Sequence, residues 1–181
     1  MAVPRQILVA LVEDKPGVLN RVAGLFRRRG FNIASLAVGH SETPNMSRMT
    51  IVVEGDEGVR QQAARQLRKL IGVMEVRDIT DDAIVARELT LIKVKALPDN
   101  RSDIISIVEI FRGDIVDVEP DSMVIQATGD ENKIEALHKM LKPFGVLEIM
   151  RTGQVAMVRG SAESTKNLSQ VRPKFKDIGG V

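Results

Sequence analysis

The fold is decided by the stretch Val12-Glu13-Asp14-Lys15-Pro16-Gly17-Val18-Leu19, in which an apolar run turns into a helical pattern. Residues 7–12 are apolar throughout, which is typical of a central β-strand. Residues 18–29 carry apolar side chains at three- and four-residue spacing, which predicts an amphipathic helix packed on that strand. The proline between them ends the strand, because proline has no N–H group for the strand ladder.

The chemistry of this corner predicts a ligand site. The first N–H groups of a helix have no partners inside the helix, and they lie at the positive end of its dipole. Gly17 has no Cβ, so a ligand can approach these amides closely. Asp14 adds a carboxylate, and the pair of charges suits a free amino acid with its carboxylate and ammonium groups. The alternative is that the Pro-Gly pair is only a turn, and the pattern alone leaves both interpretations open.

Composition excludes several function classes. The 181 residues are 44% hydrophobic, enough for one medium domain or two small ones. The 26 basic and 24 acidic residues give a net charge of +2, which makes no general case for binding nucleic acid or a membrane. Cysteine is absent, and we find neither a signal-peptide pattern nor a long apolar run. These features predict a cytoplasmic protein.

Candidate catalytic groups are scarce. His40 and His138 are the only histidines, and neither has the spacing of a metal ligand or a catalytic triad, so we interpret both as surface residues. Three arginines at 27–29 fit the end of the first helix better than a phosphate site. We therefore predict no catalytic residue, no metal site and no cofactor in this chain.

The order of the predicted elements repeats. The first half predicts strands at 7–12, 31–40, 48–53 and 73–79, with helices at 18–29 and between 56 and 71. The second half predicts strands at 87–96, 115–118, 123–128 and 146–150, with helices at 102–111 and 131–141. We expect Ser102 to cap one of these helices and Gly113 to end it, as Gly30 ends the first helix. The fold class is α+β, with two ferredoxin-like βαββαβ units that each carry two helices on one face of a four-stranded sheet.

The strand at 31–40 predicts self-association. Its side chains are expected to alternate between two faces, both largely apolar: Asn32, Ala34, Leu36 and Val38 against Ile33, Ser35 and Ala37. Because helices cover only one face, a monomer would expose an apolar patch. A homodimer through the N-terminal units would cover it.

Two motifs carry a family resemblance. The run at 14–19, followed by Arg29-Gly30-Phe31-Asn32-Ile33, resembles the ACT domain, a small-molecule sensing module. The stretches at 47–51, 87–94, 109–118 and 151–160 resemble the small regulatory subunits of acetolactate synthase, also called acetohydroxyacid synthase. The resemblance implies an effector-binding ACT domain at 5–79, a linker at 80–86 and a ferredoxin-like regulatory domain at 87–160. Residues 161–181 are then a polar tail and a candidate for disorder.

The resemblance also implies a function. Subunits of this family are not catalytic themselves: they activate a large catalytic subunit and confer feedback inhibition by a branched-chain amino acid, typically valine. The large subunit holds thiamine diphosphate, Mg²⁺ and FAD, and acts in valine, isoleucine and leucine biosynthesis. Leucine and isoleucine are the alternative effectors. The alternative function is a stand-alone ACT-type amino-acid sensor that acts on another enzyme.

The resemblance implies effector residues as well. Effector sites in the family lie between two N-terminal ACT domains of a dimer, and the predicted site comprises Asp14, Gly17, Val18, Leu19, Asn20, Asn32 and Ile33. Asn20 could instead be an exposed helix residue, and Asn32 could serve an unusual backbone angle after Gly30. The second unit has Pro98-Asp99-Asn100 at the matching corner, without the glycine, so we expect it to serve dimerisation or subunit contact.

Overall fold

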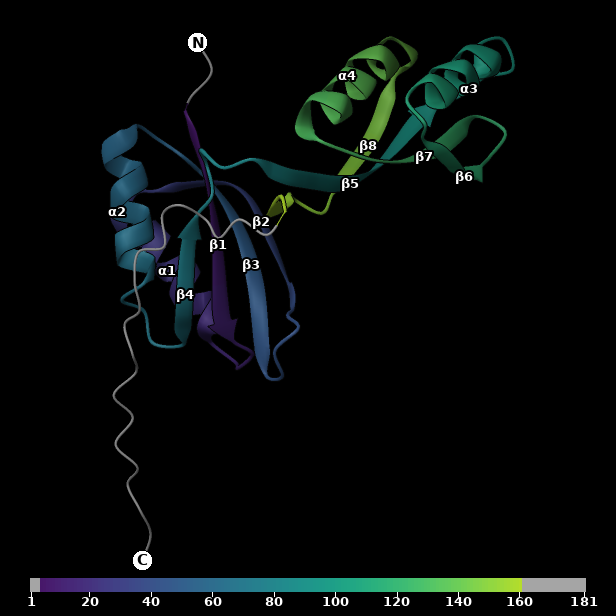
Figure 1. The fold of residues 1–181 in the computed structure, drawn as a ribbon. Coiled ribbons are helices and arrows are strands. Elements are labelled where there is room, and N and C mark those ends of the chain that lie inside the picture. The colour runs from purple at the N-terminus through teal and green to yellow at the C-terminus, as the bar shows by residue number, and fades with distance from the viewer. Residues whose placement is uncertain (1–3, 161–181) are drawn as a thin grey trace, which may run out of the picture.

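The computed structural model describes residues 4–160, which form two α+β units of the same topology (Figure 1). The first unit contains β1 (Arg5–Glu13), α1 (Val18–Arg29), β2 (Asn32–His40), β3 (Met46–Glu54), α2 (Glu57–Leu67) and β4 (Val73–Asp78). The second contains β5 (Ile84–Lys95), α3 (Arg101–Ile110), β6 (Asp114–Val118), β7 (Ser122–Gly129), α4 (Glu131–Leu141), a 3₁₀ turn (Lys142–Phe144) and β8 (Val146–Arg151). The predicted ferredoxin-like class is confirmed.

Each unit has its own hydrophobic core. The sheet orders are β2-β3-β1-β4 and β6-β7-β5-β8, with antiparallel neighbours throughout. Alternate side chains of β1 and β3 point at the helices, as period-2 patterning requires. In the first core they pack around Phe26, whose ring meets Phe31 edge-on at a centroid distance of 5.9 Å. In the second core, Ile92 and Ile125 lie opposite each other on β5 and β7, and both are fully buried.

The predicted alternation of β2 is wrong. Ile33 lies opposite Val53 and Leu36 lies opposite Ile51, so both β2 side chains pack on the helix-side core. The register shifts between Ile33 and Ser35, which is the mark of a β-bulge. A bulge adds one residue to a strand and changes the face of every side chain after it. A strict period of two therefore cannot place this strand.

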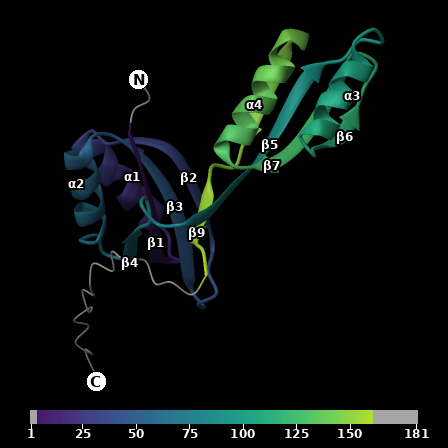
Figure 2. The ribbon, with the colours of Figure 1, turned by 45° about the horizontal axis from the view of Figure 1, so that its top comes forward.

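A short strand that the sequence did not predict covers part of the open face of the N-terminal sheet. β9 (Val155–Val158) pairs with the start of β5, at Ile84–Arg87. Figure 2 shows this ribbon lying against the N-terminal sheet on the side away from its helices. The Gln154 N–H donates to Ser35 Oγ at 2.8 Å, and the Ala156 N–H donates to Thr50 Oγ1 at 3.4 Å. The apolar face expected to be bare is thus partly covered by the chain itself.

Helix α3 also differs from prediction at both ends. It begins one residue before Ser102, with Asn100 as the capping residue and no side-chain cap. At its other end the left-handed residue is Arg112, with φ of 51°, and not Gly113. Gly113 has another role, because a Cβ there would lie 3.0 Å from the carbonyl oxygen of Gln126. Close packing against β7, and not the turn, explains this glycine.

Arg112 should therefore be suboptimal for stability. A left-handed conformation costs a non-glycine residue about 1–2 kcal/mol, and glycine recovers most of this after its own entropy cost. We expect Arg112→Gly to raise the free energy of unfolding by about 0.5–1 kcal/mol in urea titrations. Asn45→Gly is the matched control, since Asn45 has φ of 60° but asparagine tolerates that region. Equal gains from both substitutions, or a loss at position 112, would contradict this interpretation.

Two remaining predictions concern the ends of the units. β5 begins at Ile84, so part of the predicted linker at 80–86 is strand, and the domain limits stay a prediction. The predicted tail at 161–181 lies outside the described residues. Within residues 4–160, every helix is too short or too polar to cross a bilayer.

Candidate functional site

The corner between β1 and α1 leaves the start of a helix uncapped. Gly17 occupies the capping position with φ of 87°, in the left-handed region that favours glycine, and no side chain caps α1. By contrast, Asp56 and Asp130 cap α2 and α4 by accepting backbone N–H bonds at 2.9 Å. No side chain therefore occupies the first amides of α1.

One of the first amides of α1 is already bonded within the chain. The Val18 N–H donates to the Lys15 carbonyl at 3.3 Å, and the first helical bond runs from Arg21 N–H to Gly17 O at 3.0 Å. The N–H groups of Gly17, Leu19 and Asn20 have no acceptor among residues 4–160. These three amides are therefore open to an anion.

Charged side chains surround the open amides. Asp14 is exposed, and its Oδ2 lies 3.1 Å from Nδ1 of His40. Glu13 is occupied by Lys15, whose Nζ lies 3.4 Å from its Oε2. Arg21 follows one turn into the helix, and its guanidinium Nη1 would lie 3.7 Å from a Cβ placed on Gly17. A carboxylate at the corner would meet Arg21, and an ammonium group would meet Asp14.

His40 and Arg21 are the site residues that sequence reasoning missed. Arg21 lies four residues after Gly17, and that spacing alone puts it on the face of the helix start. No local signal marks His40, because it reaches Asp14 only through the pairing of β2 with β3 and of β3 with β1.

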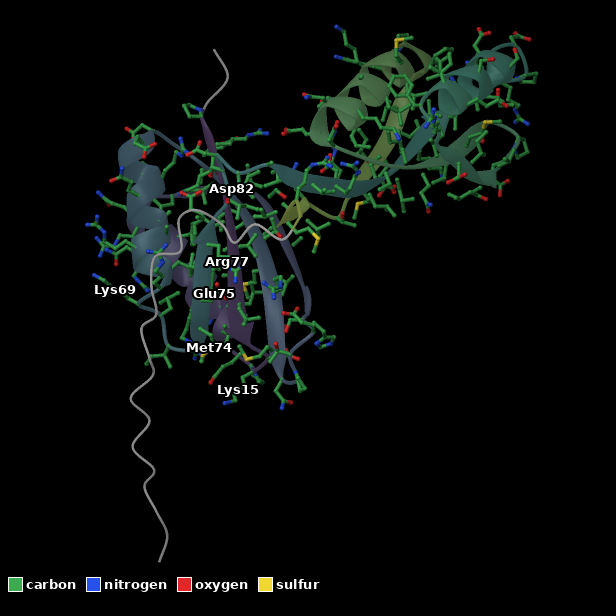
Figure 3. The ribbon with its side chains drawn as sticks, viewed as in Figure 1. Lys15, Lys69, Met74, Glu75, Arg77 and Asp82 are labelled. Atoms are coloured by element: carbon green, nitrogen blue, oxygen red, sulfur yellow. The ribbon has the colours of Figure 1, made fainter. Side chains whose placement is uncertain are left out.

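The predicted site residues do not all come together within one chain. Asn32 pairs with Glu54, which in turn pairs with Arg5 at the beginning of β1. Asp14 follows the other end of β1, where its N–H donates to Asn45 O. The length of β3 separates the two ends by about 26 Å at the usual rise per residue. Figure 3 shows the two ends of this sheet, with Lys15 at the lower end and Asp82 near the upper end.

The apolar members of the predicted site differ in how accessible their side chains are. Val18 is 2% exposed and packs in the N-terminal core, and Ile33 packs partly against the same core. Leu19 is 45% exposed, so its side chain is accessible at the helix start. Asn32 is exposed, and its amide donates to Glu54 Oε2 at 2.5 Å.

The matching corner of the second unit has an arginine at the start of its helix. Arg101 reaches back from the start of α3 and donates to the carbonyl oxygens of Glu119 at 2.6 Å and Pro120 at 2.7 Å. Its guanidinium also reaches the Ala96 carbonyl at 3.3 Å. The capping residue there is Asn100 and not a glycine, so the two corners are not equivalent. Throughout residues 4–160, no three His, Asp or Glu side chains are grouped to hold a metal ion.

Comparison with known proteins decides the family. The family described as "AHAS small subunit-like ACT domain" matches residues 8–75, and the family described as "Small subunit of acetolactate synthase" matches residues 87–160. The chain belongs to the acetolactate synthase small-subunit family. The resemblance seen in the sequence motifs is confirmed, and membership places the chain in branched-chain amino acid biosynthesis.

Relatives match this small subunit over most of its length. The acetolactate synthase small subunit of Bacillus subtilis is 49% identical over 172 residues, which cover 92% of this chain and 99% of the relative. The small subunit of Mycobacterium leprae is 51% identical over 160 residues, covering 88% and 95%. The crystal structure of the small subunit from Thermotoga maritima has a TM-score of 0.80 at 42% identity, over 88% of this chain and 100% of that one.

Proposed function

We propose that this chain is the non-catalytic regulatory subunit of an acetolactate synthase. It activates the large catalytic subunit and makes it sensitive to feedback inhibition by a branched-chain amino acid, with valine as the first candidate. The complex works in the cytoplasm. Thiamine diphosphate, Mg²⁺ and FAD belong to the large subunit in this proposal, and the small subunit supplies the effector site.

The observation that carries the proposal is the uncapped start of α1. Three open amides and Arg21 offer donors to a carboxylate, while Asp14 offers an acceptor to an ammonium group. The exposed side chain of Leu19 adds apolar surface for a branched aliphatic chain. Together these groups match a free apolar amino acid better than a nucleotide, which would need more phosphate donors.

The separation of Asn32 from Asp14 supports a site shared by two protomers. β2 is an edge strand of the N-terminal sheet, and exposed edges favour pairing with another strand. Antiparallel pairing of β2 with its copy, centred on Leu36, would place Asn32 opposite the partner's His40. That histidine contacts Asp14 within its own chain. One dimer would thus complete two effector sites, each with the corner of one protomer and Asn32 of the other.

Reconstitution tests the proposal. Acetolactate formation from pyruvate by the large subunit should rise when this chain is added, and the increment should be inhibited by valine. The purified chain alone, supplied with thiamine diphosphate, Mg²⁺ and FAD, should form no acetolactate. Leucine and isoleucine titrations rank the effectors, and a D-valine titration controls for non-specific effects.

Two outcomes would overturn parts of this assignment. Activity that is unchanged by the chain in every titration would favour an ACT-type sensor acting on another enzyme. Turnover by the rigorously purified chain alone would reject a non-catalytic role.

A further inference from the structure

A polar cavity of about 390 Å³ lies where the two units meet, remote from the β1–α1 corner. The N-terminal unit contributes β1 and β2, and the C-terminal unit contributes β5, α4 and the end of β8 with the residues that follow it. The cavity is lined by Arg5, Ala34, Leu36, Glu88, Glu131, Glu135, Arg151, Thr152 and Gly153. Its charged side chains are three carboxylates and two guanidinium groups.

Both guanidinium groups are already engaged. Arg5 of β1 pairs with Glu131 of α4 across the two units, and it also reaches Glu54 Oε1 at 3.2 Å. Arg151 donates to Glu135 Oε1 at 2.6 Å. Each cation therefore has a carboxylate of its own.

Glu88 is left without an adequate partner. It is 8% exposed, and its Oε1 receives no hydrogen bond from residues 4–160. Its nearest cation is Nη1 of Arg151 at 3.8 Å, beyond hydrogen-bonding distance. Burial, assisted by Glu131 and Glu135 and opposed by Arg151, raises the pKa of Glu88 above its ordinary value. A buried carboxylate oxygen without a donor is costly, so the cavity lacks one positive group.

We propose that this cavity binds a small organic cation, whose ammonium or guanidinium group donates to Glu88. The cation would supply the missing charge and satisfy the unpartnered oxygen. Ala34 and Leu36 are the apolar residues of the cavity lining and offer contacts to a short methylene chain. The cavity volume is in the range of small-molecule sites.

The chemistry favours an organic cation over a metal ion. No three carboxylates of the described chain converge closely enough to chelate a metal. An ammonium or guanidinium group carries several N–H donors and needs only one well-placed carboxylate. Because the ligand touches both units, its binding should also stabilise their contact by mass action.

Calorimetry with agmatine tests the proposal, since agmatine carries a guanidinium and an ammonium group on one aliphatic chain. We expect saturable binding to the full chain, and no binding of 1,4-butanediol, an uncharged control. Glu88→Gln should weaken agmatine binding at least about tenfold, because the charge-assisted hydrogen bond is lost. Affinity in the wild type should rise with pH as Glu88 loses its proton, over a range above that of an ordinary glutamate, and the Gln variant should lose that dependence.

Two further variants keep the test decisive. Glu135→Gln should also weaken binding. Arg151 is then free to pair with Glu88, and it would neutralise the Glu88 carboxylate in place of the ligand. Glu75 is a half-buried carboxylate that pairs with Arg77 outside the cavity, and Glu75→Gln should bind as the wild type does. Absence of saturable binding to the wild type, or equal affinity in the Glu88→Gln and Glu75→Gln variants, would overturn the proposal. Valine inhibition does not enter either measurement, so failure here is distinct from failure of the effector site.

Discussion

The Gly17→Asp variant of this small subunit is expected to lose inhibition by valine, with an effector affinity more than about a hundredfold weaker. The new carboxylate would lie beside the open amides of Leu19 and Asn20 and repel the carboxylate of the effector. Loss of two charge-assisted hydrogen bonds of about 1.5–3 kcal/mol each accounts for that factor. Valine titration of the reconstituted synthase measures it, and stimulation of the large subunit should remain.

Gly17→Asn is the matched control for charge. Gly17 has φ of 87°, so an aspartate there cannot adopt the extended conformation of an ordinary helix cap, and the substitution costs some stability. Asparagine and aspartate have the same size and both tolerate the left-handed region better than other residues. The Asn variant should keep more valine sensitivity than the Asp variant. Equal inhibition of both variants and the wild type would move the effector away from this corner.

The Gly153→Ala variant should release the β5–β9 ribbon from the N-terminal sheet. Gly153 has φ of 81°, and a Cβ there would lie 2.9 Å from the carbonyl oxygen of Leu36 and 3.0 Å from Ser35 Oγ. Backbone strain and the clash together should cost about 2–4 kcal/mol. Hydrogen exchange should show faster exchange of the Gln154 and Ala156 amides, which donate to Ser35 and Thr50 in the wild type.

Gly160→Ala is the control that separates the cost of backbone strain from the cost of a steric clash. Gly160 has φ of 70°, but a Cβ added there would meet no atom of the described chain within 4 Å, so only the backbone cost applies. The substitution should destabilise the chain by about 1–2 kcal/mol without selectively exposing the Gln154 amide. If both alanine variants gave the same exchange pattern, the close contact between Gly153 and Leu36 would not hold the units together.

Much of the fold is present in local sequence patterns. The apolar spacing of α1 and the glycine after it set both ends of that helix, and the structure has it at Val18–Arg29 as predicted. The strand and helix order of the second unit is equally local. These elements depend on neighbours within one or two turns, which a sequence displays directly.

The parts that could not be predicted depend on contacts distant in sequence. The bulge in β2 reflects pairing with β3, and β9 is a strand only because it meets Ile84–Arg87, about 70 residues earlier in the chain. Gly113 resembled a helix stop, yet it is required by the approach of β7 to α3.

The candidate site also has one part that follows from local sequence and another that depends on contacts distant in sequence. Asp14 and Gly17 lie within one motif, and their neighbourhood follows from the turn between β1 and α1. His40 joins them through two strand pairings, and Asn32 lies at the far end of the sheet. A single chain therefore explains the donors and the carboxylate but not the place of Asn32, which needs a second protomer in our proposal.

The most direct test of a shared effector site is complementation between two defective chains. Gly17→Asp and Asn32→Ala chains should each fail to bind valine when expressed alone. When the two are co-expressed, half of the dimers are mixed, and each mixed dimer carries one intact site and one doubly altered site. Calorimetry of the purified mixture should then recover valine binding at about one quarter of the wild-type stoichiometry. A mixture that binds no valine, although the wild type does, would contradict a site built from the corner of one protomer and Asn32 of the other.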